Sequence, residues 1–120
     1  MPKVKEWERR AIEHLAMLPI RQQAVQGMQI KAQMAPSLAD RKVIEKERAQ
    51  LLKLIKHTER ALDQLPEQGK RVLLLMYSGH LAPGAAVIKA EEELHCGRSE
   101  VYRIRERAIV EFAQRMGEMR

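Results

Sequence analysis

Arginines and other polar side chains gather in one stretch near the C-terminal end of the chain, from Leu94 to Phe112, which reads LHCGRSEVYRIRERAIVEF. A guanidinium group can donate two parallel hydrogen bonds, and this geometry matches the O6 and N7 acceptors of guanine. Arginine also binds phosphate, which adds affinity without reading sequence. Glutamate can accept a hydrogen bond from the amino group of cytosine. The residue types of this stretch therefore favour recognition of a nucleic-acid groove.

The spacing of the same residues predicts an amphipathic helix. A rotation of about 100° per residue places one apolar arc on this helix, formed by Val101, Ile104, Ala108 and Phe112. The opposite side carries Ser99, Tyr102, Arg103 and Glu106. We expect this helix to begin after Gly97, which can serve as its N-cap, and to run to about Met116, with Gly117 as a C-terminal stop.

A short helix and a turn are predicted directly before this stretch. Helix 85–94 places Val87, Ala90 and Leu94 inward, and His95-Cys96-Gly97 forms the turn. An earlier helix, 66–78, follows the Leu65-Pro66 boundary, because proline suits the first turn of a helix and disfavours helical geometry in the residue before it. Its apolar run from Val72 to Tyr77 is typical of a helix central to a small trihelical core. An exposed polar helix behind which a short helix packs is the arrangement of a helix-turn-helix domain.

The N-terminal half predicts three further helical segments. A first helix runs from about Lys3 to Leu18, and Pro19 is expected to end it; its apolar stripe is Val4, Trp7, Ala11, Leu15 and Leu18. A glutamine-rich helix follows, with Ile20, Ala24 and Met28 in partial register. Ser37 can cap a long third helix, with Asp40 three residues on.

The long helix carries a heptad seam of about three repeats, composed of Ile44, Arg48, Leu51, Ile55, Thr58, Leu62 and Leu65. Such a seam either packs on the first helix of the same chain or joins a second chain, which would give a homodimer through residues 38–65. The fold class expected from these patterns is all-α: an N-terminal helical hairpin or coiled coil over residues 1–65, and a trihelical helix-turn-helix domain over residues 66–120.

Composition narrows the class of protein further. The chain has 120 residues, a formal net charge of +6 and a pI near 9.8, which favours a polyanionic partner. Only 3% of its residues are aromatic, so aliphatic side chains must build the core. A single cysteine, Cys96, predicts a reducing compartment, and the frequent charges of the N-terminal stretch give no sign of a signal peptide or membrane anchor. We therefore expect a cytoplasmic protein, and the family resemblance given below implies a bacterial host cell and association with its nucleoid.

Catalytic and metal-binding patterns are not recognised. His95 and Cys96 are adjacent rather than spaced as ligands of one metal ion, and no histidine and acid pair accompanies the cysteine. The chain has no phosphate-binding loop, dinucleotide fingerprint or paired-carboxylate site. We expect neither an enzyme nor a cofactor.

Two segments carry a family resemblance. ALDQLPEQGKRVLLLMYSGHL and AEEELHCGRSEVYRIRERAI together resemble region four of the sigma-70 class of RNA polymerase factors, over about residues 61–112. More narrowly the chain is similar to phage and prophage late-gene transcriptional regulators of the ArpU kind. The resemblance implies base-facing positions at Arg98, Ser99, Glu100, Tyr102 and Arg103, with Arg107 available for a phosphate.

The resemblance implies a sequence-specific transcriptional regulator that binds double-stranded DNA and acts with RNA polymerase, as an activator of phage late genes. Two other functions remain open. One is the DNA-recognition subunit of a phage packaging terminase, and the other is a protein adaptor of RNA polymerase that reads no DNA.

Overall fold

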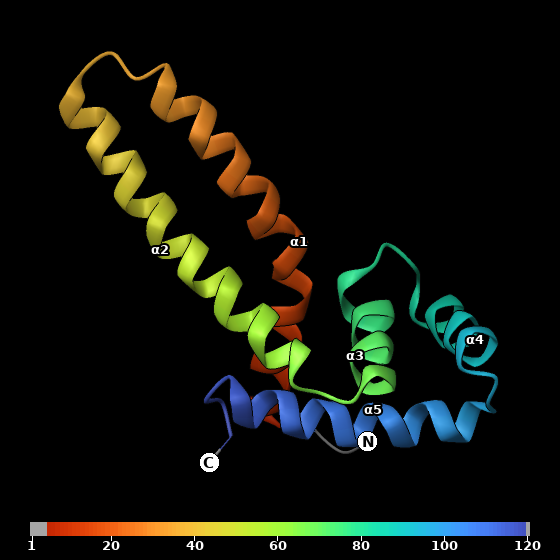
Figure 1. Cartoon of the computed structure of the whole chain (residues 1–120). Coiled ribbons are helices and arrows are strands. Elements are labelled where there is room, and N and C mark those ends of the chain that lie inside the picture. The colour runs from red at the N-terminus through yellow and green to blue at the C-terminus, as the bar shows by residue number, and fades with distance from the viewer. Residues whose placement is uncertain (1–4, 120) are drawn as a thin grey trace.

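All regular secondary structure is helical in residues 5–119, which a computed structural model describes (Figure 1). The predicted all-α class is confirmed, and the described residues contain no strand. The elements in chain order are α1 (Glu6–Gln33), α2 (Leu38–Asp63), α3 (Glu67–Leu73), a π-helical turn η1 (Leu74–Ser78), α4 (Pro83–Leu94) and α5 (Arg98–Arg115).

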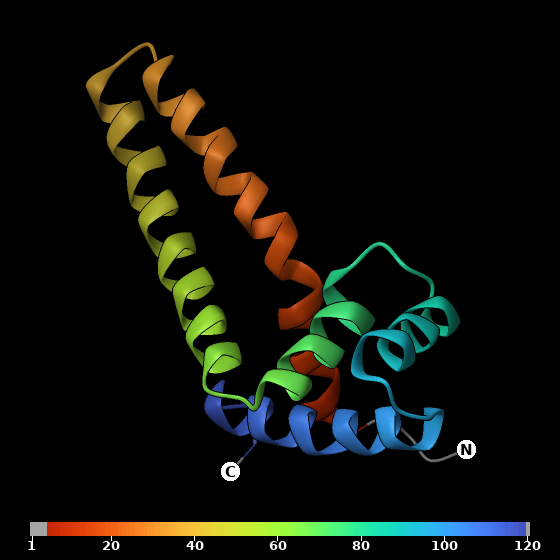
Figure 2. The ribbon, with the colours of Figure 1, turned by 45° about the vertical axis from the view of Figure 1, so that its right-hand side comes forward.

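Helices α1 and α2 run antiparallel side by side and project away from the other helices (Figures 1 and 2). We call the projecting part, residues 20–53, the arm. The molecule measures 56 × 31 × 28 Å and has a radius of gyration of 17.1 Å. A compact chain of this length would have a radius of about 14 Å. The arm therefore makes the molecule elongated.

The heptad seam of the long helix packs against α1 within the same chain. Ile55, Thr58 and Leu62 are buried, and Leu65, just beyond α2, is buried as well. The two polar seam residues bond within the chain. Arg48 donates from Nε to the Val25 carbonyl at 3.3 Å, and Thr58 donates from Oγ1 to the Leu54 carbonyl at 2.9 Å. The part of the seam from Ile55 to Leu65 therefore packs within the chain, whereas Ile44, Arg48 and Leu51 are only partly buried.

The predicted end of the first helix at Pro19 is wrong, because α1 continues through the proline to Gln33. Proline has no N–H to donate to the carbonyl four residues earlier, which is that of Leu15. Ser78 supplies the missing donor from η1, since its hydroxyl lies 2.6 Å from the Leu15 oxygen. A tertiary hydrogen bond thus replaces the helical bond that Pro19 removes. The predicted start near Lys3, with Val4, lies outside the described residues.

The expected register of the glutamine-rich segment is also wrong. Val25 and Ala32 are the buried residues there, whereas Ile20 is 56% exposed and Ala24 is exposed too. Because the helix does not stop at Pro19, it keeps the phase that Ala11, Leu15 and Leu18 set toward the core. Ile20 then falls on the opposite side of α1.

The predicted helix ends are confirmed where a side chain or a glycine defines them. Ser37 caps α2 by accepting a hydrogen bond from the Asp40 backbone N–H at 3.1 Å. Gly97 is the N-cap of α5. Gly117, with a φ of 79°, follows the end of α5. Its N–H donates to the Gln114 carbonyl, and the N–H of Glu118 donates to the Ala113 carbonyl. These two bonds make a Schellman motif.

Two hydrophobic clusters hold the helices together. The larger unites Leu15 and Leu18 of α1 and Leu62 of α2 with Ile109 and Phe112 of α5. It therefore joins residues on both sides of the Leu65-Pro66 boundary. The smaller lies among α3, η1, α4 and α5 and contains Val72, Leu75, Val87, Ala90 and Val101.

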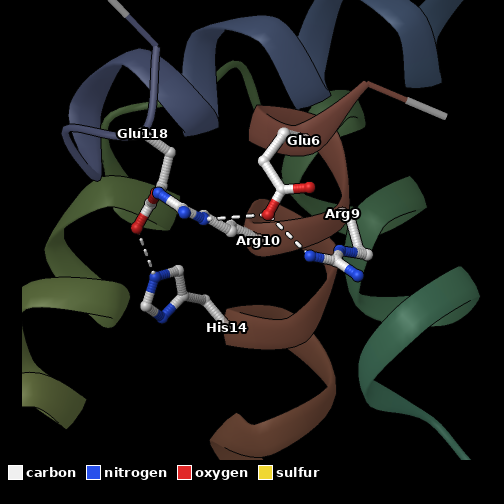
Figure 3. Close-up of polar contacts among 5 residues, drawn as sticks. All are labelled: Glu6, Arg9, Arg10, His14 and Glu118. Atoms are coloured by element: carbon white, nitrogen blue, oxygen red, sulfur yellow. Dashed lines mark hydrogen bonds and ion pairs between the residues drawn. The ribbon is translucent and has the colours of Figure 1, made fainter.

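The C-terminal turn is tied back to α1 by polar contacts (Figure 3). His14 Nε2 lies 3.0 Å from Glu118 Oε1, and both side chains are mostly buried. Arg10 approaches the second oxygen of Glu118 at 3.7 Å and also contacts Glu6. These contacts fix the end of α5 over the first turns of α1. Within residues 5–119, no helix is long and apolar enough to cross a membrane.

Candidate nucleic-acid interface

Helix α5 has the two faces that its sequence predicts. Val101 and Phe112 are fully buried, Ala108 is 4% exposed, and Ile104 is partly buried against the smaller cluster. The apolar arc therefore holds the helix from beneath.

The opposite face of α5 is open to solvent. Of the residues predicted to contact a nucleic acid, Arg98, Ser99, Tyr102, Arg103 and Arg107 are exposed and Glu100 is partly exposed. They lie within the first ten residues of α5, where a rotation of about 100° per residue spreads them over an arc of about 200°, with Arg98 near one edge and Glu100 and Arg107 near the other. This surface begins at the turn after α4, and α5 runs below α3 and α4 in the view of Figure 2. We call this set of six residues the α5 polar face.

Arg103 and Glu100 form an ion pair on this face. Their N–O distance is 3.1 Å, and their side chains are 62% and 45% exposed. An exposed pair of this kind contributes only about 0–1 kcal/mol. Arg103 can therefore leave Glu100 for another partner at small cost.

Arg98 and Tyr102 lie together one turn apart. The Arg98 guanidinium carbon is 5.7 Å from the centre of the Tyr102 ring, within the range of a cation–π contact. The Tyr102 residue is 40% exposed. The contact restrains both side chains at the start of the helix, beside the turn.

Arg105 does not belong to the polar face, although it lies among the four arginines of the stretch. Its side chain is only 12% exposed, and it donates hydrogen bonds to the Tyr77 hydroxyl at 2.7 Å and to Glu8 at 2.6 Å. A third bond reaches exposed Glu106. Burial alone would lower the pKa of Arg105, but the bonds to Tyr77 and Glu8 raise it overall, so the guanidinium stays charged.

This network connects three elements. Glu8 lies on α1, Tyr77 on η1 and Arg105 on α5, so one guanidinium joins the helix that carries the polar face to two other parts of the fold. Burial raises the pKa of Tyr77, and the hydrogen bond from Arg105 lowers it in part. Arg105 thus positions α5 and is not free to contact a partner.

Helix α4 is fixed behind α5 by small residues and by an ion pair. Ala86, Val87 and Ala90 are buried on its inner face. Arg71 of α3 pairs with Glu93 through two hydrogen bonds of 2.6 and 2.8 Å. This two-point contact keeps α4 in one orientation relative to α3.

The turn between α4 and α5 is tight. His95 ends α4 in the left-handed conformation, with φ 52° and ψ 47°, which non-glycine residues adopt uncommonly. Cys96 is partly buried and packs against the smaller cluster, as expected for the small residue of such a turn. Three residues therefore reverse the chain between the two helices.

Helices α3 and α5 also approach closely. A Cβ atom added at Gly69 would lie 3.0 Å from the Cβ of Ala108. The absence of a side chain at Gly69 therefore lets α3 rest directly on α5 at Ala108.

The sequence predicted the polar face of α5 but not the side chains of η1 that hold α5 and α1 in place. The π-helical turn puts Tyr77 and Ser78 where they reach Arg105 and Leu15, and no residue pattern distinguishes this turn from regular helix.

No group of three or more potential metal-ligating side chains occurs among residues 5–119. Comparisons with family models, curated proteins and solved structures found no match for this chain.

Proposed function

We propose that α4, the turn and α5 act as a helix-turn-helix that binds double-stranded DNA through the α5 polar face. The observation that carries the proposal is that face itself: three unburied arginines, with Tyr102, Ser99 and Glu100, on a helix whose other side is anchored in the core. An α-helix fits the major groove, where base edges differ in their donors and acceptors.

The roles of individual residues follow from their positions. Arg103 lies in the middle of the polar face and reads guanine, while Glu100 accepts from a neighbouring cytosine. Arg98 at the helix start and Arg107 at the far side bind phosphates, which set the register of the helix in the groove. Arg105 contributes no contact, because Tyr77 and Glu8 already hold it.

The resemblance to region four of sigma-70 factors extends the proposal to transcription. In that reading the chain is a regulator of phage or prophage genes that binds promoter DNA and works alongside RNA polymerase. The exposed basic face supports DNA as the partner, and the resemblance alone supports the assignment to transcription.

The test is selection of bound duplexes from a random DNA library, followed by binding measurements on the selected sequence. Arg103→Ala is expected to lose roughly 1–3 kcal/mol at one base position and to relax the preference there. Arg107→Ala is expected to weaken binding of every sequence equally and to reduce the salt dependence by about one phosphate contact.

Arg115→Ala is the matched control. Arg115 lies at the other end of the same helix and bonds to Gln64 and Glu111, away from the polar face. Its replacement should leave DNA binding unchanged. If no sequence is enriched, or if Arg103→Ala binds all duplexes as the wild type does, direct DNA reading is wrong, and a protein-binding adaptor becomes the better explanation of the polar face.

A further inference from the structure

The outer face of α1 carries a second stripe, uncharged and mostly apolar, that no part of the described chain covers. Its residues alternate spacings of four and three, and all are exposed: Ala16, Ile20, Gln23, Gly27, Ile30 and Met34. Ile20, Ile30 and Met34 are 56%, 59% and 77% exposed. The stripe lies on the side of α1 opposite Leu18 and Val25, which face the core.

This face is unusually poor in charge. Between Ala16 and Ala39 the only charged residues are Arg21 and Lys31, whereas five glutamines occur in the same segment. Charged residues are depleted at the centre of protein interfaces, and methionine is enriched. Nucleic acid would need more cations, and a charged protein would find nothing complementary here.

Gly27 lies in the middle of the stripe, and no contact within the described chain requires a glycine there. It is helical, and an added Cβ would meet nothing within 4 Å. Glycine in an exposed helix interior is less favourable than alanine, so its presence lowers the helix's own stability. A glycine does allow another helix to approach closely.

We propose that α1 pairs with α1 of a second copy of this chain, antiparallel, through this stripe. Centred near Val25, the antiparallel register places Ala16 opposite Met34, Ile20 opposite Ile30, and Gln23 opposite Gly27. Each large side chain then faces a small one, except for the isoleucine pair. A parallel pairing would instead set Gly27 against Gly27 and Met34 against Met34, which leaves a gap at one level and crowding at another.

The flanking positions agree with this register. Met17 faces Lys31 of the other copy, Ala24 faces Ala24 and Gln26 faces Gln26, so no two like charges meet. The stripe spans about 27 Å of helix at a rise of about 1.5 Å per residue. This dimer uses the outer face of α1 and leaves the heptad seam of α2 packed within each chain.

The experiment measures the mass of the full-length protein by sedimentation velocity, without DNA, over a wide range of concentration. The wild type is expected to dimerise. Ile20→Glu and Ile30→Lys should each give monomers at concentrations where the wild type is a dimer. The variant with both substitutions should dimerise again, because the glutamate introduced into each chain meets the lysine introduced into the other.

Ile88→Glu on α4 is the matched control, since Ile88 is 57% exposed and lies outside the stripe; it should leave the dimer intact. Circular dichroism of each variant checks folding. A wild type that stays monomeric throughout, or a dimer that neither single variant weakens, overturns the proposal. Failure of the double variant to recover overturns the antiparallel register. None of these readouts depends on DNA, so the two proposals fail separately.

Discussion

Arg105 and Arg107 are two residues apart on α5, yet their surroundings give them opposite roles. Arg107 is exposed on the polar face, whereas the side chain of Arg105 is 12% exposed and engages Tyr77 and Glu8. The helical phase at Arg105 lies on the edge between the polar and apolar arcs. Sequence alone therefore could not separate an arginine that contacts a partner from one that holds the fold together.

We expect Arg105→Ala to lower the free energy of unfolding by about 2–3 kcal/mol, because it leaves Glu8 and the Tyr77 hydroxyl in a mostly buried site without their main donor. Arg107→Ala should change stability by less than about 0.5 kcal/mol. Urea unfolding followed by circular dichroism measures both. Equal effects of the two substitutions would show that the network contributes nothing.

Tyr77 gives the network a dependence on pH. Burial raises the pKa of its hydroxyl above the usual value near 10, so the folded state holds the proton more tightly than the unfolded state. The stability contributed by this difference is complete below about pH 10 and is lost as the pH rises through the folded-state pKa.

As the pH rises above about 10, the wild type should therefore lose more stability than Tyr77→Phe, which has no hydroxyl to ionise. The variant starts from a lower value at neutral pH, by about 1 kcal/mol, because the bond from Arg105 is absent. Urea unfolding at a series of alkaline pH values compares the two slopes. Parallel slopes would mean that Tyr77 ionises alike in both states.

At the scale of elements, the sequence was informative wherever one residue determines a helix end. Ser37, Pro66, Gly97 and Gly117 act locally, through a cap, a restricted φ or a left-handed residue, and their effects need no knowledge of the rest of the fold. Pro19 was misread because its consequence depends on Ser78, which is 59 positions later and reaches Leu15 from a π-helical turn.

The coupling of Pro19 and Ser78 can be measured by a double-mutant cycle. Ser78→Ala in the wild type should cost about 1 kcal/mol, because the Leu15 carbonyl loses its donor. In the Pro19→Ala background the restored backbone N–H can bond to Leu15, so the same substitution should cost little. Thermal unfolding of the four proteins gives an expected coupling of about 1 kcal/mol. Equal costs in both backgrounds would mean that the two residues act independently.

At the scale of the molecule, the sequence predicted the polar face of α5 but not the distant residues that hold α5 in place. Helical phase and the boundary residues predicted that residues 66–116 form three helical segments, because these signals are local; the π-helical turn η1 and the start of α4 at Pro83 were not predicted. The packing of the first turns of α1 against α5 joins residues about a hundred positions apart, as in the pair of Glu8 and Arg105. Contacts between residues so far apart in the sequence produce no local periodicity from which they could be predicted.

The distribution of the core has a dynamic consequence. Buried residues are dense where α1, α2 and α5 meet, whereas in the arm only Val25 and Ala32 are buried along α1 before the turn. Regions with few buried contacts open at a lower free energy than the global unfolding reaction. The arm should therefore open locally while the helices around Phe112 stay closed.

Hydrogen exchange tests whether the arm opens at a lower free energy than the helices around Phe112. The suitable protein is Ile20→Glu, which is expected to be monomeric. Amides of residues 41–50 in α2 should exchange much faster than those of residues 108–113 in α5, because the arm amides open without global unfolding. In the wild type at high concentration, amides of residues 20–33 should slow more than those of residues 41–50, since only α1 is paired. Uniform protection along both helices of the monomer would show that the arm unfolds only together with the core.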